Sequence, residues 1–255
     1  MTTRTNPLHV GLAALGIALA GCGRADHRQE PKRTSGDAIP LHLHIRSTIA
    51  GADLAYDTVY RRAGTPAFTV TDCRYYISHI EAIRDDGAAI PVSDTVVLVD
   101  PGRRVYEPGS LPRGVYRGVR FVVGLDSATN HGDPTVFAAG HPLAMQTPSM
   151  HWDWNSGYLF MKVEGRVDTT GKGGGVPATE FFYHFGTDAM KRTVDVAVRF
   201  AVGDSSAGPV RLCFDLGTML ERVDMRTETS THSFDNAPLA AGMADRWGSA
   251  FSSDE

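Results

Sequence analysis

Several short segments of this chain alternate apolar and polar residues with a period of two. They are residues 41–45, 68–70, 95–99, 116–123, 158–163 and 193–200. Side chains of an extended strand point to opposite faces in turn, so this alternation is typical of β-strands. Turn-forming runs such as Asp85-Asp86-Gly87 and Asp100-Pro101-Gly102 separate the segments. We therefore predict an all-β fold, an antiparallel β-sandwich.

Helical periodicity is scarce, with one short candidate near residues 238–247. No internal repeat or shift in composition divides residues 38–255, which are numerous enough to bury one sizeable core. The sequence predicts a single domain over residues 38–255 with few short helices.

The first residues follow a different pattern. Arg4 precedes an uncharged, mostly apolar run from Leu8 to Ala20, which leads into Gly21-Cys22. A membrane-spanning helix needs about 20 apolar residues, so this shorter run indicates a secretory signal peptide over residues 1–21. The Leu-Ala-Gly-Cys ending resembles the bacterial lipobox, in which the cysteine is lipidated and becomes the first residue of the mature chain. An ordinary signal peptide with an unmodified cysteine is the alternative.

Residues 22–37 are polar, charged and free of aromatic side chains, so they cannot bury enough apolar area to offset the entropy cost of ordering. We interpret them as a flexible tether between the lipidated Cys22 and the domain. The residue after Cys22 is Gly23 and not Asp. By the usual sorting rule for lipoproteins, this favours the outer membrane of a Gram-negative cell. The chain is expected to be exported and held at that membrane by its lipid.

Composition and motifs exclude several classes of function. The formal net charge is −4 and the arginines are scattered, so no basic stripe indicates a nucleic-acid partner. The chain has no Gly-x-Ser-x-Gly elbow, no His-Glu-x-x-His pair, no P-loop and no Cys-x-x-Cys-His haem attachment motif. We expect a protein that is not an enzyme, while a hydrolase without a recognisable motif remains a further alternative.

Two of the three cysteines are left if lipid modifies Cys22. Cys73 and Cys213 each lie in a strand-like apolar segment, and an exported protein folds in an oxidising compartment. They could form a disulfide or remain inert buried thiols.

A series of short motifs runs through residues 51–233. They are Gly51 to Tyr60 with Gly64, Arg74 to Ser78, Val97 to Asp100, Phe121 to Asp126 with Asn130, Met150 to Phe160, Glu164-Gly165, Tyr183 to Gly186 and Thr231 to Ser233. The block Met-x-Trp-x-Trp-x-Ser-Gly-Tyr at 150–158 is the most specific of them. In this order the motifs resemble those of the MbnP-like copper-binding proteins, a family named for the methanobactin-associated periplasmic protein.

The resemblance implies a β-rich fold and a site for copper. In characterised branches of the family, histidine imidazole binds the metal together with a tryptophan that has been oxidised to kynurenine. That oxidation is attributed to a dihaem partner protein similar to cytochrome c peroxidase. Copper favours imidazole nitrogen, and opening an indole creates an aromatic amine that tryptophan lacks. Trp152 and Trp154 are the candidates here. Either could instead be an ordinary core or rim aromatic.

Four histidines are candidate ligands. By the resemblance His184 matches a recurrent histidine of the family, although a structural histidine would also fit. His42 and His44 share one face of the first strand and could chelate a metal or simply face solvent. In an extended strand Trp152 and Trp154 would share one face, and His151 would lie on the opposite face, away from both.

One departure from the family pattern affects the first strand. Relatives often carry a histidine shortly before the glycine equivalent to Gly51, where this chain has Ser47, so His42 or His44 would have to replace it. A loop cluster of His131, His141 and Met145 would suit Cu(I), or could be chance.

These observations lead to one predicted site and one rival function. A hairpin through the glycine-rich turn at 171–175 would bring His184 towards the tryptophan block. We predict that His184, one of His42 or His44, and one of Trp152 or Trp154 lie within about 8 Å of a common point. The chain would then be a surface copper-binding lipoprotein in acquisition or storage. The alternative is a metal-free β-sandwich that acts as a structural or interaction module.

The lipobox predicts that the native protein begins at Cys22 and carries a diacylglyceryl group there. Mass spectrometry of the N-terminal peptide from native membranes should show the lipid and no residue before Cys22. A mature chain that begins elsewhere and carries no lipid would contradict the predicted surface anchor. Cys22→Ala is the matching control, because it should release the protein from the membrane fraction.

Overall fold

The computed structural model describes residues 38–62, 64–93, 95–152, 157–171, 175–203 and 209–254. The predicted signal peptide, Cys22, the tether and Trp154 lie outside these residues. The strands are β1 (Ala38–Ile49), β2 (Ala52–Asp53), β3 (Phe68–Arg84), β4 (Ala89–Ser93), β5 (Val97–Val99), β6 (Val105–Pro112), β7 (Gly114–Val123), β8 (Met161–Val167), β9 (Thr179–Phe185), β10 (Arg192–Val202), β11 (Val210–Asp215), β12 (Ser230–Thr231) and β13 (Phe251–Ser253). The helices are α1 (Ser127–Asn130), η1 (Pro134–Val136), η2 (Asp188–Met190), α2 (Leu216–Met219), α3 (Ala237–Ala244) and α4 (Trp247–Ala250).

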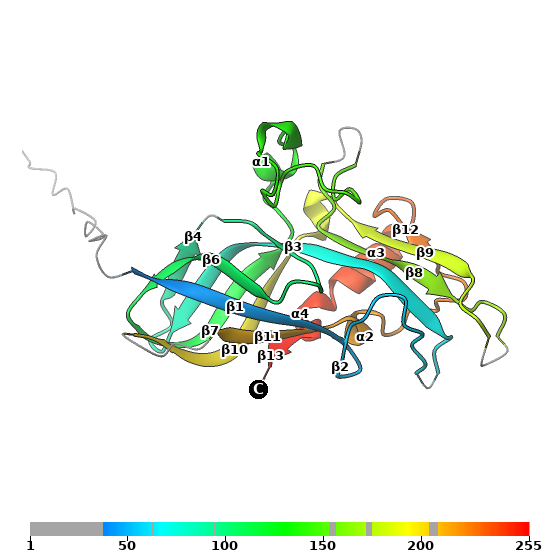
Figure 1. The fold of residues 1–255 in the computed structure, drawn as a ribbon, viewed down its shortest axis with the longest axis horizontal. Helices are drawn as coiled ribbons and strands as arrows, with labels where there is room; N and C mark the ends of the chain where they lie inside the picture. Colours follow the sequence, from blue (N-terminus) through cyan, green and yellow to red (C-terminus); the bar gives the residue numbers. More distant parts are fainter. Residues whose placement is uncertain are drawn as a thin grey trace, which may run out of the picture. The chain divides into compact units, whose positions relative to one another are not determined.

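The strands form two mixed sheets (Figure 1). The first, sheet A, has the order β13-β11-β1-β2, and β6 also pairs with β1. The second, sheet B, has the order β10-β7-β3-β8-β9-β12, and β4 and β5 also pair with β3. The predicted β-sandwich is confirmed. Most pairings are antiparallel as expected, but β1 pairs with β11, and β9 with β12, in parallel.

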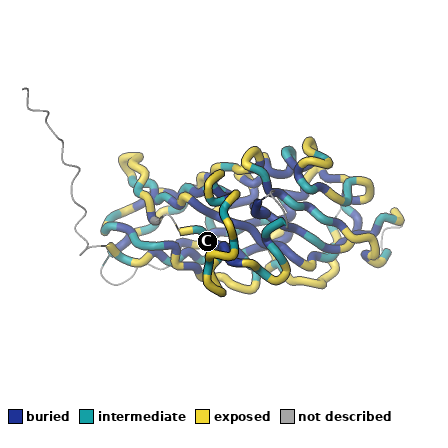
Figure 2. The backbone as a smooth tube through the Cα atoms, turned by 90° about the horizontal axis from the view of Figure 1, so that it is seen from above, coloured by how far each residue is buried: buried dark blue, intermediate teal, exposed yellow. Residues whose placement is uncertain are grey.

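The core lies where the inward faces of the two sheets meet (Figure 2). Along β1 the side chains of Leu41, Leu43 and Ile45 are buried, and those of His42 and His44 are half-buried on the other face. This is the alternation that the sequence predicts.

Aromatic rings join the sheets. The ring of Tyr75 on β3 lies 4.9 Å from that of Phe214 on β11 and 5.7 Å from that of Phe251 on β13, measured between centroids. Rings at such spacings add to the stabilisation from burial. The helical candidate near the C-terminus is also confirmed, because α3 and α4 lie there, and α4 buries Trp247 in the same core.

The long strand β3 carries two other strands end to end along one edge. Ile77 pairs with Val97 of β5 and Val123 of β7, so β5 and β7 lie on opposite edges of β3. Tyr75 pairs with Val99 of β5 and with Met161 of β8, which places β8 on the same edge as β7. The connection 124–160 therefore leaves the sheet at the junction between β7 and β8 and rises above it in Figure 1.

The two cysteines lie on different sheets, Cys73 on β3 and Cys213 on β11, and both are free thiols. The disulfide that the sequence allowed is not formed in this structure: Cys73 is fully buried, whereas Cys213 lies between the buried Leu212 and Phe214 on β11 and so points to the other face of that strand. Burial raises the pKa of Cys73 well above its usual value, which keeps it in the unreactive thiol form. Cys213 is half-buried, and its Sγ lies 3.3 Å from the hydroxyl of Thr48.

Among the described residues, no helix has the length and apolar character needed to cross a membrane.

Gly165 on β8 gives the fold a testable point of tight packing. A Cβ atom there would collide with the carbonyl oxygen of Thr69 and would lie 2.8 Å from the Phe181 ring. Gly165→Ala should therefore lower the free energy of unfolding by about 1–3 kcal/mol, the usual cost of overpacking. Gly203→Ala is the control, because no atom lies within 4 Å of a Cβ at that position. Chemical denaturation measures both variants, and equal losses would contradict the packing described for β8.

Candidate metal centre

A chain of charged side chains crosses the polar face of sheet B. Asp72 and Arg74 come from β3, Lys162 and Glu164 from β8, and His184 from β9. Lys162 Nζ lies 3.2 Å from an Asp72 carboxylate oxygen and 3.1 Å from a Glu164 carboxylate oxygen. Arg74 approaches Asp72 to 2.6 Å, and His184 Nε2 lies 2.8 Å from Glu164 Oε1. The strand register builds this chain, because Lys162 pairs with Arg74 on one side and with His184 on the other.

Burial makes these charges depend on one another. Side-chain exposure is 7% for Lys162 and 9% for Asp72, and a buried charge is costly unless it is paired. Burial opposes ionisation of Glu164, but the hydrogen bond from the histidine and the charge of Lys162 outweigh it, so the pKa of Glu164 lies below its usual value. Arg74 also donates a hydrogen bond to the carbonyl oxygen of Pro148, 3.1 Å away, which ties the connection 124–160 to this face.

The imidazole of His184 is held in one orientation. Its side chain is 13% exposed. An ionised carboxylate only accepts hydrogen bonds, so the contact with Glu164 places the proton of the neutral ring on Nε2. The other nitrogen, Nδ1, is buried and has no hydrogen-bond partner among the described residues. The lone pair of His184 Nδ1 is therefore buried and accepts no hydrogen bond from the described residues.

A second imidazole, that of His232, faces the first. Strand β12 runs parallel to β9 with Thr231 opposite Tyr183, so the next residue, His232, lies beside His184. The two ring centroids are 5.0 Å apart and the ring planes stand at 86°. His232 lies within the sequence motif Thr231 to Ser233 but was not among the predicted ligands.

His232 repeats the arrangement of His184 with a different carboxylate. Its Nδ1 lies 2.8 Å from Asp235 Oδ2, and its backbone N–H donates to Asp235 Oδ1 at 2.6 Å. Burial opposes ionisation of Asp235, but these two bonds outweigh it and hold the pKa of the carboxyl below its usual value. The side chain of His232 is 43% exposed, and its Nε2 has no partner within the part of the chain that the structure describes. The pair thus joins a buried nitrogen to one that solvent can reach.

Trp152 packs at the end of β9 beside this pair. A Cβ atom at Gly186 would lie 2.9 Å from Cζ3 of the Trp152 ring, so only glycine leaves room for the indole. The ring centroid of Trp152 lies 5.3 Å from that of Phe234, which follows the His232 segment. The hydroxyl of Ser233 joins both parts, since it accepts the Gly186 N–H and donates to the His184 carbonyl oxygen, each at 3.0 Å.

The structure does not bring the other predicted histidines to this place. His42 Nδ1 lies 3.3 Å from Glu107, and His44 Nδ1 lies 3.2 Å from Arg211. Both are on β1 in sheet A, whereas His184 is on β9 in sheet B. The expectation that one of them completes the site is corrected, because β1 and β9 belong to different sheets. His151 packs its ring 4.8 Å from that of Tyr158, measured between centroids.

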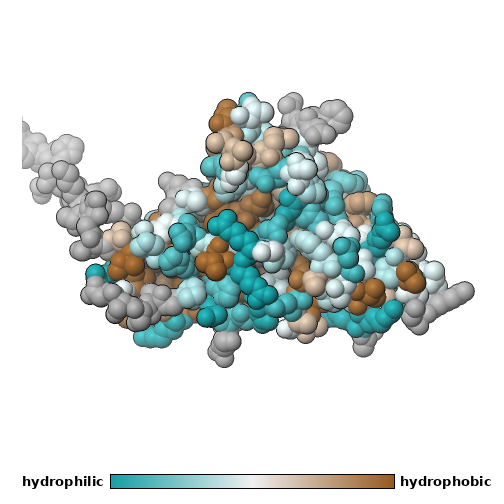
Figure 3. Space-filling model, in the orientation of Figure 1, coloured by the Kyte–Doolittle hydropathy of each residue, from teal (hydrophilic) through white to brown (hydrophobic). Residues whose placement is uncertain are grey.

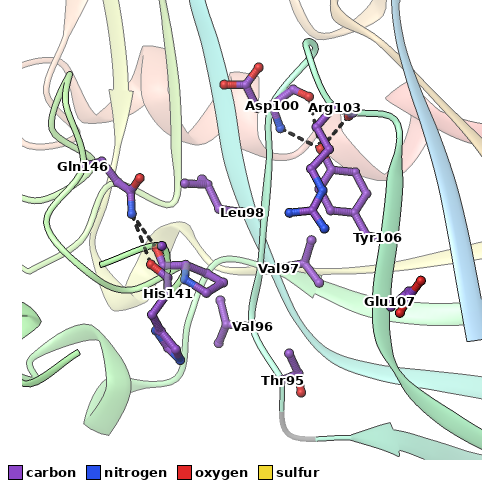
Figure 4. Close-up of a pocket in the computed structure, with 12 residues that line it drawn as sticks. Thr95, Val96, Val97, Leu98, Asp100, Arg103, Tyr106, Glu107, His141 and Gln146 are labelled. Carbon is purple, nitrogen blue, oxygen red and sulfur yellow. Dashed lines mark hydrogen bonds between the residues drawn. The ribbon is translucent and has the colours of Figure 1, made fainter. Parts of the chain in front are cut away.

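The loop cluster also stays apart from the histidine pair. His141 Nδ1 accepts the Leu143 N–H at 3.1 Å, and its ring stacks 4.3 Å from Phe137. His141 also lines a separate pocket of about 310 Å³ between the loop and β5 (Figure 4). Apolar surface gathers in the hollow beneath the α1 segment (Figure 3). His131 lies 3.7 Å from Asp188. Met145 is exposed.

No three His, Cys, Asp or Glu side chains of the described residues meet in a way that could hold a metal ion. The arrangement offers instead two imidazole nitrogens, each backed by a carboxylate on its other nitrogen. Metal-binding histidines commonly have such a carboxylate, because it fixes the ring and raises its basicity as a ligand. Two imidazoles suit copper among other transition metals, and a third donor would have to come from the neighbouring tryptophan block.

Comparisons with known proteins agree with this architecture. The model of the MbnP family matches residues 38–234 of the chain. Among solved structures, MbnP from Methylosinus trichosporium is similar with a TM-score of 0.55 and 19% sequence identity, over 84% of this chain and 97% of that one. At that identity the likeness concerns the fold. No curated protein matches the chain.

Because Glu164 contacts Nε2 of His184 and Asp235 contacts Nδ1 of His232, we expect the two neutral rings to be opposite tautomers. At a pH where both imidazoles are neutral, proton–nitrogen correlation spectra of the metal-free protein should show His184 protonated at Nε2 and His232 at Nδ1. Glu164→Ala should remove the preference of His184, whereas Glu107→Ala should leave it. A proton on Nδ1 of His184 in the unchanged protein would contradict the orientation described for this ring.

Proposed function

The chain belongs to the MbnP family, and from this premise we propose that it binds copper between His184 and His232 with a third donor from Trp152 or Trp154. The observation that carries the proposal is the pair of facing imidazoles, each of which has one nitrogen hydrogen bonded to a carboxylate and one nitrogen without a partner among the described residues. A buried nitrogen lone pair without a partner is unfavourable in a protein, and a metal ion would satisfy it.

Copper fits this donor set better than the hard cations. Calcium and magnesium require oxygen ligands, which the facing nitrogens do not supply. Among divalent first-row metals, nitrogen sites bind copper most strongly, and its cuprous form accepts low coordination numbers. Glu164 and Asp235 would hold the two rings in place, and the exposed edge of His232 gives the ion a path from solvent.

The third donor requires a change in a tryptophan. An indole N–H donates and does not accept, so Trp152 as encoded cannot act as a nitrogen ligand. Oxidation to kynurenine cleaves the C2–C3 bond of the indole with two equivalents of peroxide, which supply one oxygen atom to each carbon and leave as water. Hydrolysis then releases C2 as formate and leaves an aromatic amine. We propose that a dihaem peroxidase-like partner catalyses this oxidation. Support for Trp152 comes from its half-buried ring against Gly186 and Phe234, beside the histidine pair.

The place of action follows from the sequence of the N-terminus. With Cys22 lipidated, residues 22–37 would tether the copper-binding domain to the outer membrane of a Gram-negative cell. We propose that the domain serves copper acquisition or storage there and catalyses no reaction itself.

Removal of either imidazole tests the site. In protein purified from native membranes, His184→Ala and His232→Ala should each lower the copper content at least about tenfold, since even the loss of a hydrogen-bond partner behind a ligand costs that much in other metal sites. His44→Ala is the matched control and should retain copper, because that ring contacts Arg211 in the other sheet. Elemental analysis gives the metal content, and circular dichroism establishes that each variant is folded.

The same preparations test the modified tryptophan. Peptide mass spectrometry of the segment around residues 150–160 should find kynurenine at Trp152 or Trp154 in the native protein. Unchanged copper content in both histidine variants, or no copper in the native protein, would end the metal-binding proposal in favour of a metal-free β-sandwich that acts as an interaction module.

A further inference from the structure

Two adjoining cavities lie where Arg61, Arg62 and residues 64–67 meet Asp168, Gly171 and the segment after α2. One has a volume of about 300 Å³ and the other about 520 Å³. They share Arg62, Thr65, Pro66 and Arg226 as walls, so they form one two-chambered cleft. We refer to it as the arginine cleft.

Four guanidinium groups line this cleft. Arg61 belongs to the smaller chamber, Arg222 to the larger one, and Arg62 and Arg226 to both. Arg62 donates one hydrogen bond, to the carbonyl oxygen of Gly217 at 3.0 Å. Arg61 and Arg222 make no side-chain hydrogen bond or ion pair with the described part of the chain. Most of the donors of the four side chains are therefore available to a ligand.

The acidic residues of the cleft are largely engaged in local turns. Asp168 accepts hydrogen bonds from the Thr170 N–H and hydroxyl, which hold the pKa of this carboxyl below its usual value. Asp224 accepts from the Arg226 N–H at 3.2 Å and from the Thr227 hydroxyl at 3.0 Å, while the guanidinium of Arg226 stays 3.9 Å from it. Only Glu221 remains as an acidic lining residue without such a bond among the described residues.

Arg222 is held at the cleft in an unfavourable backbone conformation. Its φ is +62°, a left-handed value that side-chain-bearing residues seldom adopt. Burial, and then the nearby charge of Arg222, lower the pKa of Arg246. Arg222 therefore lies near a further arginine outside the cleft lining, on which the charges of Glu221, Asp245 and Glu228 also act. Strain of this kind is concentrated at functional sites, where the surrounding structure maintains it.

We propose that the arginine cleft is a binding site for phosphoryl groups. Guanidinium forks match the oxygens of phosphate and bind them by paired charge-assisted hydrogen bonds. Two chambers with Arg62 and Arg226 between them suit a ligand that carries two anionic groups or an anion with an attached polar group. Free inorganic phosphate and the phosphodiester of a lipid headgroup share this chemistry. The site is independent of copper, because its lining residues do not include His184 or His232.

Calorimetric titration with inorganic phosphate and co-sedimentation with vesicles test the proposal at constant ionic strength. The vesicles contain either phosphatidylcholine alone or phosphatidylcholine with phosphatidylglycerol. Binding should be saturable, and Arg222→Gln and Arg226→Gln should each weaken it at least about tenfold, as expected when a charge-assisted fork is lost. Arg199→Gln is the matched control, because this exposed arginine pairs with Asp85 on another part of the molecule and should change nothing.

The results also separate the two sources of the phosphoryl group. Saturable binding of inorganic phosphate supports a site for a free anion, and binding of phosphatidylglycerol vesicles alone supports a headgroup site, provided that the two cleft variants lose it. Arg226→Lys distinguishes a fork from a point charge, since it should keep less than about a third of the affinity if the guanidinium geometry matters. Binding that is equal in the cleft variants and the control, or the absence of binding in both assays, overturns the proposal.

Discussion

The buried ion chain on sheet B is the constraint on which the rest of the site depends. Lys162 lies between Asp72 and Glu164 at low exposure, so loss of any partner would leave an unpaired charge away from water. The hydrogen bond from His184 and the charge of the same lysine lower the pKa of Glu164, and the ionised carboxylate in turn orients His184. Because Arg74 extends the chain to the carbonyl of Pro148, the position of the connection 124–160 is coupled to the same set of charges.

The topology of β3 explains why these parts meet. Strands β7 and β8 lie end to end along one edge of β3. The connection 124–160 and the shorter connection from β9 to β10 therefore both cross the junction between β7 and β8. Trp152 lies on the first of these, and Gly186 begins the second. At the junction itself Gly124 has φ +116°, and a Cβ there would lie 2.7 Å from the Phe160 ring. The site is therefore assembled where the sheet divides into two ribbons.

Local patterns in the sequence were sufficient to predict the strands but not to predict which strands pair with one another. Alternation identified β1 and the common face of His42 and His44, because it reports only which side of a strand each residue occupies. It could not show that β1 and β9 lie in different sheets. His232 was missed for the same reason: the parallel pairing of the two-residue strand β12 with β9 joins segments distant in sequence and leaves no periodicity to detect. His184 could be proposed because its motif is local and resembles that of a known family. Cys73 and Cys213 were recognised as strand residues, but nothing in the sequence indicated that their side chains leave the two facing strands in different directions.

The parallel pairing of β1 gives the domain a particular response to mechanical load. The chain enters β1 at Ala38, so a pull from the N-terminal side acts along the axis of this strand. From Leu43 onwards β1 is hydrogen bonded to β11 on one edge, while β6 and then β2 hold the other. Force applied in that direction loads these bonds together in shear, whereas a strand at the margin of the sheet would have bonds on one edge alone to resist it. The tether that we propose at Cys22 would thus join the domain through a strand that is hydrogen bonded on both of its edges.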